Sequence, residues 1–377
     1  MNLSSMAAGA MTVVGTCAAV APGEHVLILT DTAVPRGVAD ALAFAAAAVG
    51  GIPVILTMPR PERPGAELPP LVAEAMKRAD VILAPTSLSV FHTEASRGAG
   101  AAGARMLAIS ECRAETLIRG GITADFTRRA PVADGLARAL SGEQLELRTP
   151  AGTHLTVRLG GRAGVANTGL ATRRGARSGL PTIEAYIAPL EGTADGVAVV
   201  DASVAVLGLV SAPIAIRFVE GCAVAFDGGA QARALQDLVE QVGHAKARML
   251  SEVGIGLNPR ARVVGRIIED EGAYGTCHVA LGSNTHFGGR LDVPFHLDMV
   301  MWLPDIAVDG RPLLTGGRLV EEAATRDELS TRRTRTDRNL RWCRPSSIGD
   351  WCSSRACRRS TARAAPSAAT LRRRRTR

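Results

Sequence analysis

The chain has 377 residues, of which 46% are hydrophobic and 21% are charged. These proportions are typical of a globular protein, and they exclude a collagen, a coiled coil or a wholly disordered chain. At about 150 residues per domain, the length predicts two domains. The net charge of +8 does not indicate a nucleic-acid partner. Residues 326–377, with 16 Arg and four acidic residues, contribute +12 of it, which leaves −4 for the rest of the chain.

The expected location follows from the apolar segments and the cysteines. No Lys or Arg precedes an apolar run in the first 21 residues, so no secretory signal peptide is expected. The longest apolar stretch, 197–216, is interrupted by polar residues and glycine, which predicts two buried strands rather than a membrane span. The seven Cys residues are scattered, as is typical of a reducing compartment. We therefore expect a cytoplasmic protein with neither a membrane nor a nucleic-acid partner.

The first third of the chain alternates short apolar runs with helical patterns. Continuous apolar runs bounded by turn residues are typical of strands buried on both faces. Such runs occupy residues 26–29, 54–57, 81–84 and 105–109, and helical patterns cover 38–49, 70–78 and 94–102. This alternation predicts an α/β domain with a parallel sheet over residues 1–145. No G-x-G-x-x-G motif follows the first strand, so a dinucleotide cofactor is not expected.

From about residue 145 the pattern changes to short strands separated by glycines. A hairpin and three further strands are expected at 145–148, 153–158, 197–201, 213–218 and 222–226, and one long helix from about Gln231 to Glu252. These elements predict a mixed, mostly β domain over residues 146–325. The Arg-rich tail, 326–377, has no apolar periodicity. We expect the tail to be disordered or the product of a frame shift, and to contribute nothing to folding.

Five side chains of metal-binding types occur in Gly- or Pro-framed segments of the second domain: Glu184, Glu252, His278, His296 and Asp298. Residues i and i+2 of a strand point to the same face, so His296 and Asp298 would lie side by side above an apolar face. A His-x-Asp pair alone is more often structural, so the prediction depends on finding four such segments in one domain. Carboxylates with imidazoles favour Zn, Co, Mn or Fe, and this set suffices for two ions.

These segments resemble the aminopeptidase T (thermophilic leucyl aminopeptidase) family of metallopeptidases. The similarity spans most of residues 1–320, and its motifs are Glu184 before Ala188-Pro189, Glu252 in Glu-Val-Gly-Ile-Gly-x-Asn-Pro, His278 in Gly-Thr-Cys-His-Val-Ala-Leu-Gly, and His296-Leu297-Asp298-Met299. The resemblance implies a homodimeric enzyme that hydrolyses N-terminal residues from small peptides. It implies that the five side chains hold two divalent ions (Zn, Co or Mn), and we also predict a catalytic role for Glu184.

Two departures from this family favour an alternative. The Lys that usually follows Asp270-Glu271 is Gly272, and the metal-site Tyr falls on Thr285. A relative in the same superfamily, 2,5-dihydroxypyridine 5,6-dioxygenase, has an Asn-Thr-x-x-Gly-Gly segment like residues 284–289 and uses one Fe(II) held by two His and one Asp. Its His-x-Asp matches 296–298, whereas its other ligand His falls on Glu252. It also lacks a counterpart of His278.

The relative's active-site His in the first domain resembles His92, which we therefore predict as a catalytic residue. The alternatives to the peptidase are thus a mononuclear Fe(II) ring-cleaving dioxygenase with a small-molecule substrate, and an inactive binding protein. His286 adjoins the glycine loop, where it would either line the site or lie outside it. His244 is expected in the middle of the long helix, Asp270 or Glu271 beside the ligands, and His25 and His154 in solvent.

Overall fold

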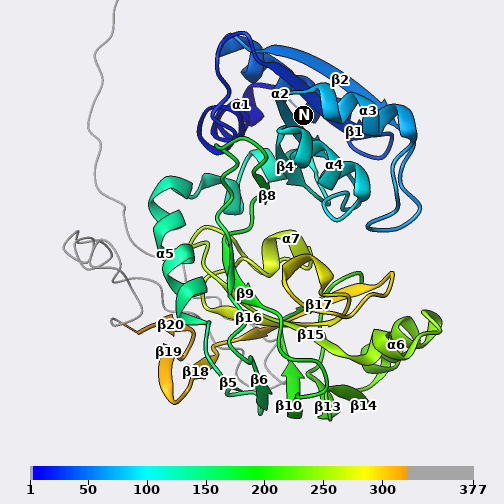
Figure 1. The fold of residues 1–377 in the computed structure, drawn as a ribbon, viewed down its shortest axis with the longest axis vertical. Helices are drawn as coiled ribbons and strands as arrows, with labels where there is room; N and C mark the ends of the chain where they lie inside the picture. Colours follow the sequence, from blue (N-terminus) through cyan, green and yellow to red (C-terminus); the bar gives the residue numbers. More distant parts are fainter. Residues whose placement is uncertain (1–2, 321–377) are drawn as a thin grey trace, which may run out of the picture. The chain divides into compact units, whose positions relative to one another are not determined.

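A computed structural model describes residues 3–320, which belong to one compact unit, Met1–Thr331. The predictions for the Arg-rich tail, residues 326–377, lie outside these described residues. Within residues 3–320, no helix is both long and apolar enough to cross a membrane. The same residues form a parallel sheet with helices, followed by two largely antiparallel sheets, which confirms the predicted fold class (Figure 1).

The parallel sheet has the strand order β2-β1-β3-β4-β8. Its strands are β1 (His25–Asp31), β2 (Ile52–Met58), β3 (Val81–Pro85), β4 (Arg105–Ile109) and β8 (Arg177–Gly179). The four predicted strands lie within the first four of these. β8 pairs in parallel with β4 although it comes from beyond residue 145, so the sheet takes a strand from the second predicted domain. The predicted domain boundaries stay a prediction.

Helices cover both faces of the parallel sheet. They are α1 (Leu3–Met11), the π-helical η1 (Thr12–Cys17), α2 (Arg36–Ala48), α3 (Pro70–Arg78) and α4 (Glu94–Ala102). Val26 and Ile28 of β1 share a core with α1, η1 and α2, whereas Leu27 and Leu29 share one with α3 and α4. Because successive side chains of a strand point to opposite faces, a strand covered on both sides has an unbroken apolar run.

Two antiparallel sheets follow. The eight-stranded sheet, ordered β14-β13-β10-β6-β5-β18-β19-β20, contains β5 (Gln144–Arg148), β6 (His154–Arg158), β10 (Asp195–Val200), β13 (Ile214–Val219), β14 (Cys222–Asp227), β18 (Asp305–Val308), β19 (Arg311–Thr315) and β20 (Arg318–Leu319). The seven-stranded sheet, ordered β12-β11-β17-β16-β15-β9-β7, contains β7 (Val165–Asn167), β9 (Glu184–Ile187), β11 (Ser203–Val204), β12 (Gly208–Leu209), β15 (Leu250–Gly256), β16 (Thr276–Gly282) and β17 (His296–Trp302). The remaining helices are η2 (Ala114–Leu117), η3 (Gly120–Thr123), α5 (Phe126–Ala139), α6 (Ala230–Gln241), η4 (Ala245–Arg248), α7 (Ile267–Asp270) and η5 (Thr285–Phe287).

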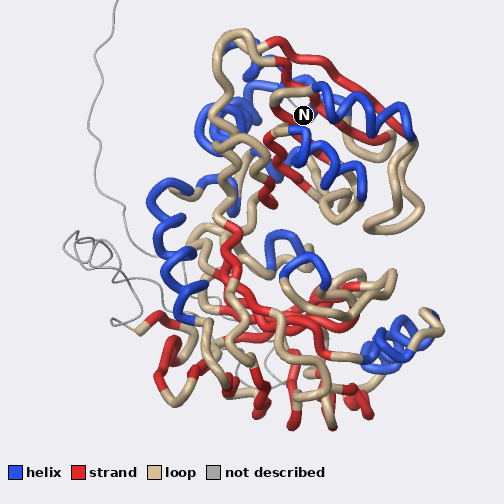
Figure 2. The backbone as a smooth tube through the Cα atoms, in the orientation of Figure 1, coloured by secondary structure: helices blue, strands red, loops and turns tan. Residues whose placement is uncertain are grey.

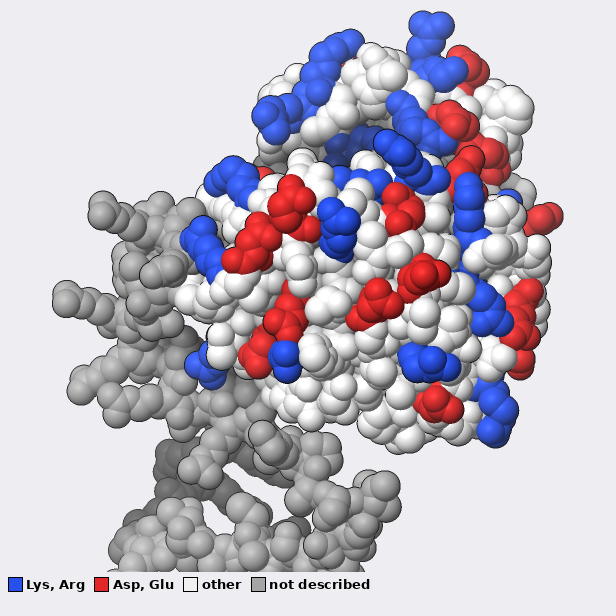
Figure 3. Space-filling model, turned by 60° about the horizontal axis from the view of Figure 1, so that its bottom comes forward, with Lys and Arg blue, Asp and Glu red and all other residues white. Residues whose placement is uncertain are grey.

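The two antiparallel sheets lie next to each other (Figure 2) and share one apolar core. Leu147 and Ile216 of the eight-stranded sheet belong to the same buried cluster as Val253, Val279 and Met299 of the seven-stranded sheet. Burying one such side chain stabilises the fold by about 1.5–3 kcal/mol relative to leaving it in water. One face of the seven-stranded sheet is thereby committed to the core, and its other face is available for polar residues. On the side of the molecule shown in Figure 3, acidic and basic side chains are interspersed.

The predicted helix from Gln231 to Glu252 is wrong in its second half. α6 ends at Gln241, and Gly243 follows with a φ of +66°. That left-handed conformation suits glycine and stops the helix. The chain then forms η4 and enters β15, where Glu252 pairs with Ala280 of β16. His244 is therefore not in the middle of a helix: its Nδ1 accepts a hydrogen bond from the backbone N–H of Lys246 at the start of η4.

Candidate metal centre

The five predicted ligand residues lie on one face of the seven-stranded sheet. They come from four adjacent strands: Glu184 from β9, Glu252 from β15, His278 from β16, and His296 and Asp298 from β17. The register places them together, since Glu252 lies opposite Ala280, which lies opposite Asp298. The residues between them point to the shared core. The fold thus brings together side chains from segments far apart in sequence, although their roles as ligands stay a prediction.

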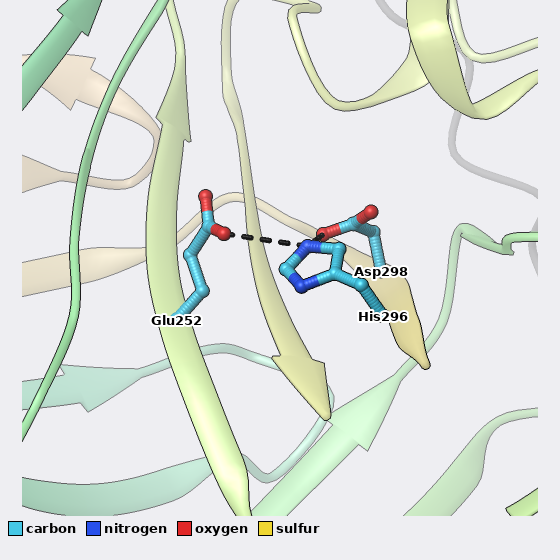
Figure 4. Close-up of side chains that lie close together, drawn as sticks. All are labelled: Glu252, His296 and Asp298. Atoms are coloured by element: carbon cyan, nitrogen blue, oxygen red, sulfur yellow. Dashed lines mark hydrogen bonds and ion pairs between the residues drawn. The ribbon is translucent and has the colours of Figure 1, made fainter. Parts of the chain in front are cut away.

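Glu252, His296 and Asp298 form the tightest group. His296 Nε2 lies 3.2 Å from Asp298 Oδ1 and 3.4 Å from Glu252 Oε2 (Figure 4). One ligand atom from each residue lies within 4.8 Å of the others, a spacing that allows them to share one cation. His296 Nδ1 is 2.8 Å from the backbone oxygen of Ser283. A carbonyl only accepts, so Nδ1 carries a proton, and Nε2 is the atom presented to a metal.

Electrostatics in this group favour a cation. Burial lowers the pKa of His296, but the Asp298 and Glu252 carboxylates outweigh it and raise the pKa to about 10. Burial raises the pKa of Asp298, and the His296 charge more than reverses this, leaving that pKa below its usual value. With no metal present, His296 is therefore an imidazolium that supplies the positive charge which the two carboxylates require.

His278 extends the group toward Glu184. Its Nε2 lies 3.3 Å from Glu252 Oε1 and 3.7 Å from Glu184 Oε2, and only 1% of its side chain is exposed. A Cβ on Gly254, the residue opposite His278 in the sheet, would lie 2.1 Å from the imidazole. The imidazole therefore extends over β15 toward β9, in space that only a glycine at position 254 leaves free. Among residues 3–320, His278 Nδ1 and Glu184 Oε2 are buried without a hydrogen-bond partner.

The pKa values of His278 and Glu184 are also strongly shifted. Burial lowers the pKa of His278, but the hydrogen bond with Glu252 and the charge of Glu184 raise it to about 9. Burial raises the pKa of Glu184 to about 7; the charge of His278 opposes that shift and the charge of Glu252 adds to it. Three carboxylates thus face two imidazoles on a partly buried sheet face. That donor set fits a divalent metal.

Aromatic rings lie beside this cluster. His92, after β3, stacks on His286 of η5 at 4.6 Å between ring centroids and 18° between planes. Phe287 meets Tyr186 edge-on at 5.2 Å between ring centroids and His296 edge-on at 6.3 Å. Solvent still reaches His92, but packing around the ring and then the positive charge of His296 keep the pKa of His92 well below its usual value, so its ring is neutral.

Arg97 contacts the backbone of His92 and the ring of His286. Its Nη1 donates to the backbone oxygen of His92 at 2.8 Å and lies 3.2 Å from His286 Nδ1. Since a guanidinium only donates, His286 Nδ1 accepts, and the proton of the neutral ring is on Nε2. Arg97 also pairs with Glu94. Of the two outcomes considered for His286, the structure therefore favours a position beside the cluster.

Asp270 and Glu271, which were also predicted near the ligands, accept hydrogen bonds from neighbouring groups. Asp270 accepts the backbone N–H groups of Val264 and Gly265 at 2.7 and 2.9 Å, which is a loop-capping arrangement. Glu271 receives a hydrogen bond from Thr182 Oγ1 at 3.3 Å. Burial, followed by the charge of Glu184, raises the pKa of Glu271 well above its usual value.

The two histidines predicted in solvent are exposed. Two residues near the cluster, Tyr186 and Asn167, were not predicted from the sequence. His25 and His154 each lie near a carboxylate at the surface. Tyr186 shares a sheet face with Glu184, a position that the i, i+2 rule would have indicated. Asn167 Nδ2 lies 3.4 Å from Glu184 Oε1 through the pairing of β7 with β9. That contact has no local sequence signal.

A sheet face that carries carboxylates and imidazoles is typical of metal-dependent enzymes. The family model of 2,5-dihydroxypyridine 5,6-dioxygenase (NicX) matches residues 8–321, and the chain belongs to this family. It is 26% identical over 264 residues to the 2,5-dihydroxypyridine 5,6-dioxygenase of Pseudomonas putida KT2440, covering 67% of this chain and 74% of that protein.

Two solved structures share the fold. The 2,5-dihydroxypyridine dioxygenase of P. putida KT2440 matches with a TM-score of 0.72 and 21% identity, over 85% of this chain and 98% of that one. Wild-type AmpT from Thermus thermophilus matches with a TM-score of 0.60 and 18% identity, over 84% and 99%. The predicted relationship to aminopeptidase T thus holds at the level of the fold.

The family match overturns the predicted main function. The chain is an enzyme of a dioxygenase family, and its prediction as a hydrolase, aminopeptidase and protease is wrong. The error arose because the resemblance depended on Glu184, Glu252 and His278, whose residue types suit a cation in more than one class of enzyme. Ligand-type residues specify that a cation fits, and they do not specify the reaction.

Proposed function

We propose that this enzyme is a ring-opening dioxygenase that acts on a hydroxylated pyridine or a related dihydroxylated ring. The family match supports the reaction class, and the observation that carries the proposal is the Glu252–His296–Asp298 group beside stacked aromatic rings. A planar, electron-rich ring suits such surroundings, because aromatic rings pack favourably face to face or edge to face. The substrate is then a small molecule.

The metal that we propose is a single Fe(II) held by Glu252, His296 and Asp298. A set of imidazole and carboxylate ligands on one side of an ion leaves positions open on the other, as in non-haem iron oxygenases. Bound there, Fe(II) would supply the redox chemistry by which both atoms of O2 enter the ring product. Glu252 replaces the His expected in this family, so one more carboxylate than usual would contact the ion.

His278 and Glu184 then support the ligands instead of holding a second ion. With Nε2 protonated, His278 donates to Glu252 Oε1 at 3.3 Å, and Glu184 Oε2 faces the same nitrogen. This arrangement fixes the orientation of the Glu252 carboxylate, as residues behind metal ligands commonly do. Glu184, predicted as a catalytic residue, would thus act through His278.

His92 is the proposed residue that meets the substrate hydroxyl. Its ring is neutral, so one nitrogen has a free lone pair and can accept a hydrogen bond or a proton from a ring hydroxyl. Stacking on His286 holds the plane of His92. The predicted homodimer remains part of this proposal, and no contact in the structure bears on it.

The proposal is tested by loading the anaerobically purified protein with Fe(II) and following O2 consumption with 2,5-dihydroxypyridine. We expect one iron per chain and one O2 consumed per ring opened. Asp298→Ala should lose both, whereas Asp237→Ala, at an exposed site on α6, should lose neither. Two ions per chain would contradict the single-iron site, and absence of O2 uptake with hydroxylated pyridines would contradict the reaction.

A further inference from the structure

Arg177 lies at the edge of the parallel sheet, where neighbouring groups hold its side chain in place. It lies on β8, and its side chain passes over Gly100 of α4, where a Cβ would approach Arg177 Cδ to 3.3 Å. Its Nη1 donates to the backbone oxygen of Phe91 and to Ser96 Oγ, both at 3.0 Å. The guanidinium carbon lies 4.9 Å from the centroid of the Phe91 ring. These contacts fix a long, flexible side chain in one orientation.

The charge of Arg177 has no counter-ion. Within residues 3–320, no carboxylate forms an ion pair with it, and Nε and Nη2 have no hydrogen-bond acceptor. Other part-buried arginines differ, since Arg162 pairs with Glu191 and Arg105 pairs with Glu24. Burial and the nearby charge of Arg97 lower the pKa of Arg177. A half-buried cation is stabilised when an anion joins it, so this position favours an anionic ligand.

A row of rings connects Arg177 to the candidate metal centre. Phe91, under the guanidinium, meets His92 edge-on at 5.0 Å, and His92 stacks on His286. Phe287 follows His286 in η5 and approaches His296 with 6.3 Å between ring centroids, which continues the row of rings to the metal-type cluster. Only the Phe91 ring separates Arg177 from His92, so a ligand whose hydroxylated ring contacts His92 would have Arg177 near a ring substituent.

We propose that Arg177 binds a carboxylate on the ring substrate, so that the substrate class is a hydroxylated pyridine or benzene that carries a carboxylate. This inference rests on the proposed ring-opening function and specifies its substrate. A guanidinium offers two parallel N–H groups that match the two oxygens of a carboxylate. The single uncompensated charge also suits a monoanion better than a phosphate group, which carries about −1.5 to −2.

The test is calorimetric binding under anaerobic conditions, where no turnover occurs. The protein as purified is titrated with 6-hydroxynicotinate and with 2-hydroxypyridine, which has the same ring and hydroxyl but no carboxylate. We expect tighter binding of 6-hydroxynicotinate by about 10- to 100-fold, the contribution of a charge-assisted hydrogen bond. Arg177→Gln should reduce this ratio to near one and leave 2-hydroxypyridine binding unchanged. Arg174→Gln, at an exposed arginine nearby, should retain the full ratio.

Equal binding of the two ligands by the wild-type protein, or an unchanged ratio in Arg177→Gln, would overturn the proposal. If Arg177→Gln melts well below the wild-type protein, Arg177→Lys decides, because it keeps the charge but not the paired N–H groups. A ratio reduced several-fold supports the proposal, and an unchanged ratio overturns it. Oxygen uptake does not enter this test, so a carboxylate preference without any ring opening would contradict only the proposed function.

Discussion

Two regions of the molecule contain buried carboxylates, and they are satisfied differently. Asp31, at the end of β1 in the parallel sheet, is 1% exposed. Its two oxygens accept the backbone N–H groups of Ala33 at 2.9 Å and Ser87 at 2.6 Å. On the seven-stranded sheet, Glu184, Glu252 and Asp298 instead face one another and two imidazoles. Backbone donors stabilise the first carboxylate, whereas the three carboxylates of the cluster have two imidazoles to balance them.

This difference separates carboxylates that the backbone stabilises from carboxylates that require a positive partner. A carboxylate that accepts backbone N–H groups is already stabilised as an anion and needs no cation. A group of carboxylates without such donors destabilises the fold unless protons or a metal compensate, and the raised pKa values of His296 and His278 show that protons do so here. The burial of a carboxylate is therefore a poor guide to function, and the identity of its donors is a good one.

The largest effect is expected at His296. Replacing it with Ala removes the imidazole that contacts both Asp298 and Glu252, and should reduce metal affinity by more than the 10–100-fold typical of supporting residues. Circular dichroism should remain that of the wild-type protein. His154→Ala, at an exposed site on β6, is the control. Undiminished metal content in His296→Ala, measured after dialysis by atomic emission, would remove this residue from the proposed ligands.

Gly254→Ala tests whether His278 supports the ligands. The added methyl group would lie 2.1 Å from the imidazole, so the ring must move away from Glu252. We expect metal affinity to fall by about 10–100-fold. Gly15→Ala is a matched control, because nothing lies within 4 Å of the position of its Cβ. Equal affinities of the two variants would show that His278 has no supporting role.

Asp31→Ala should affect stability and leave the metal unchanged. The substitution leaves the N–H groups of Ala33 and Ser87 without their acceptor, at a cost of about 2–4 kcal/mol in the free energy of unfolding. Urea denaturation measures this change, and metal analysis provides the contrast with His296→Ala. Loss of metal from the folded Asp31→Ala variant would break the distinction between the two regions.

The smallest effect is expected at Glu191, a carboxylate that accepts hydrogen bonds from both an arginine side chain and a backbone N–H. It pairs with Arg162 at 2.7 Å and accepts the N–H of Arg290 at 2.7 Å. Burial raises its pKa, but these donors outweigh burial and lower the pKa to about 2. Because the pKa of Glu191 is lower in the folded than in the unfolded state, its ionised form stabilises the fold at pH values above about 4.5. This stabilisation disappears as the pH falls toward 2.

Glu191→Gln should therefore be less stable than the wild-type protein by about 1 kcal/mol at pH 7, after allowance for solvent screening. The difference should vanish by about pH 2, as followed by chemical denaturation across that range. Glu143→Gln, at an exposed acid, should show no comparable pH dependence. A stability difference that persists unchanged at low pH would contradict the ion-pair explanation.

The sequence predicted those parts of the fold that depend on local patterns. β1, β3 and β4 are buried on both faces, so continuous apolar runs in the sequence predict where these strands lie. The alternation along β17 placed His296 and Asp298 on one face correctly. The prediction of a helix up to Glu252 extends the helical pattern of α6 past Gly243, where the helix in fact stops. The strand that contains Glu252 forms only through pairing with β9 and β16, which are distant in sequence.

The adjacency of Glu184 and His278 could not be predicted for the same reason. Neither residue is near the other in the chain, and the imidazole reaches Glu184 only because Gly254 leaves space between their strands. The reaction was mispredicted for a different reason. The same residue types suit hydrolysis and oxygenation, and the choice depends on the ion and the substrate rather than on ligand chemistry.

The central claim is that the cluster of Glu252, His296 and Asp298 supports ring opening by O2. The most direct measurement is mass spectrometry of the product formed from 2,5-dihydroxypyridine by the Fe(II)-loaded enzyme under 18O2. We predict that each product molecule contains two 18O atoms and that the Asp298→Ala variant forms no product. A product whose added oxygen comes from water would contradict the account, as would a fully iron-loaded enzyme that opens neither 2,5-dihydroxypyridine nor a dihydroxypyridine that carries a carboxylate.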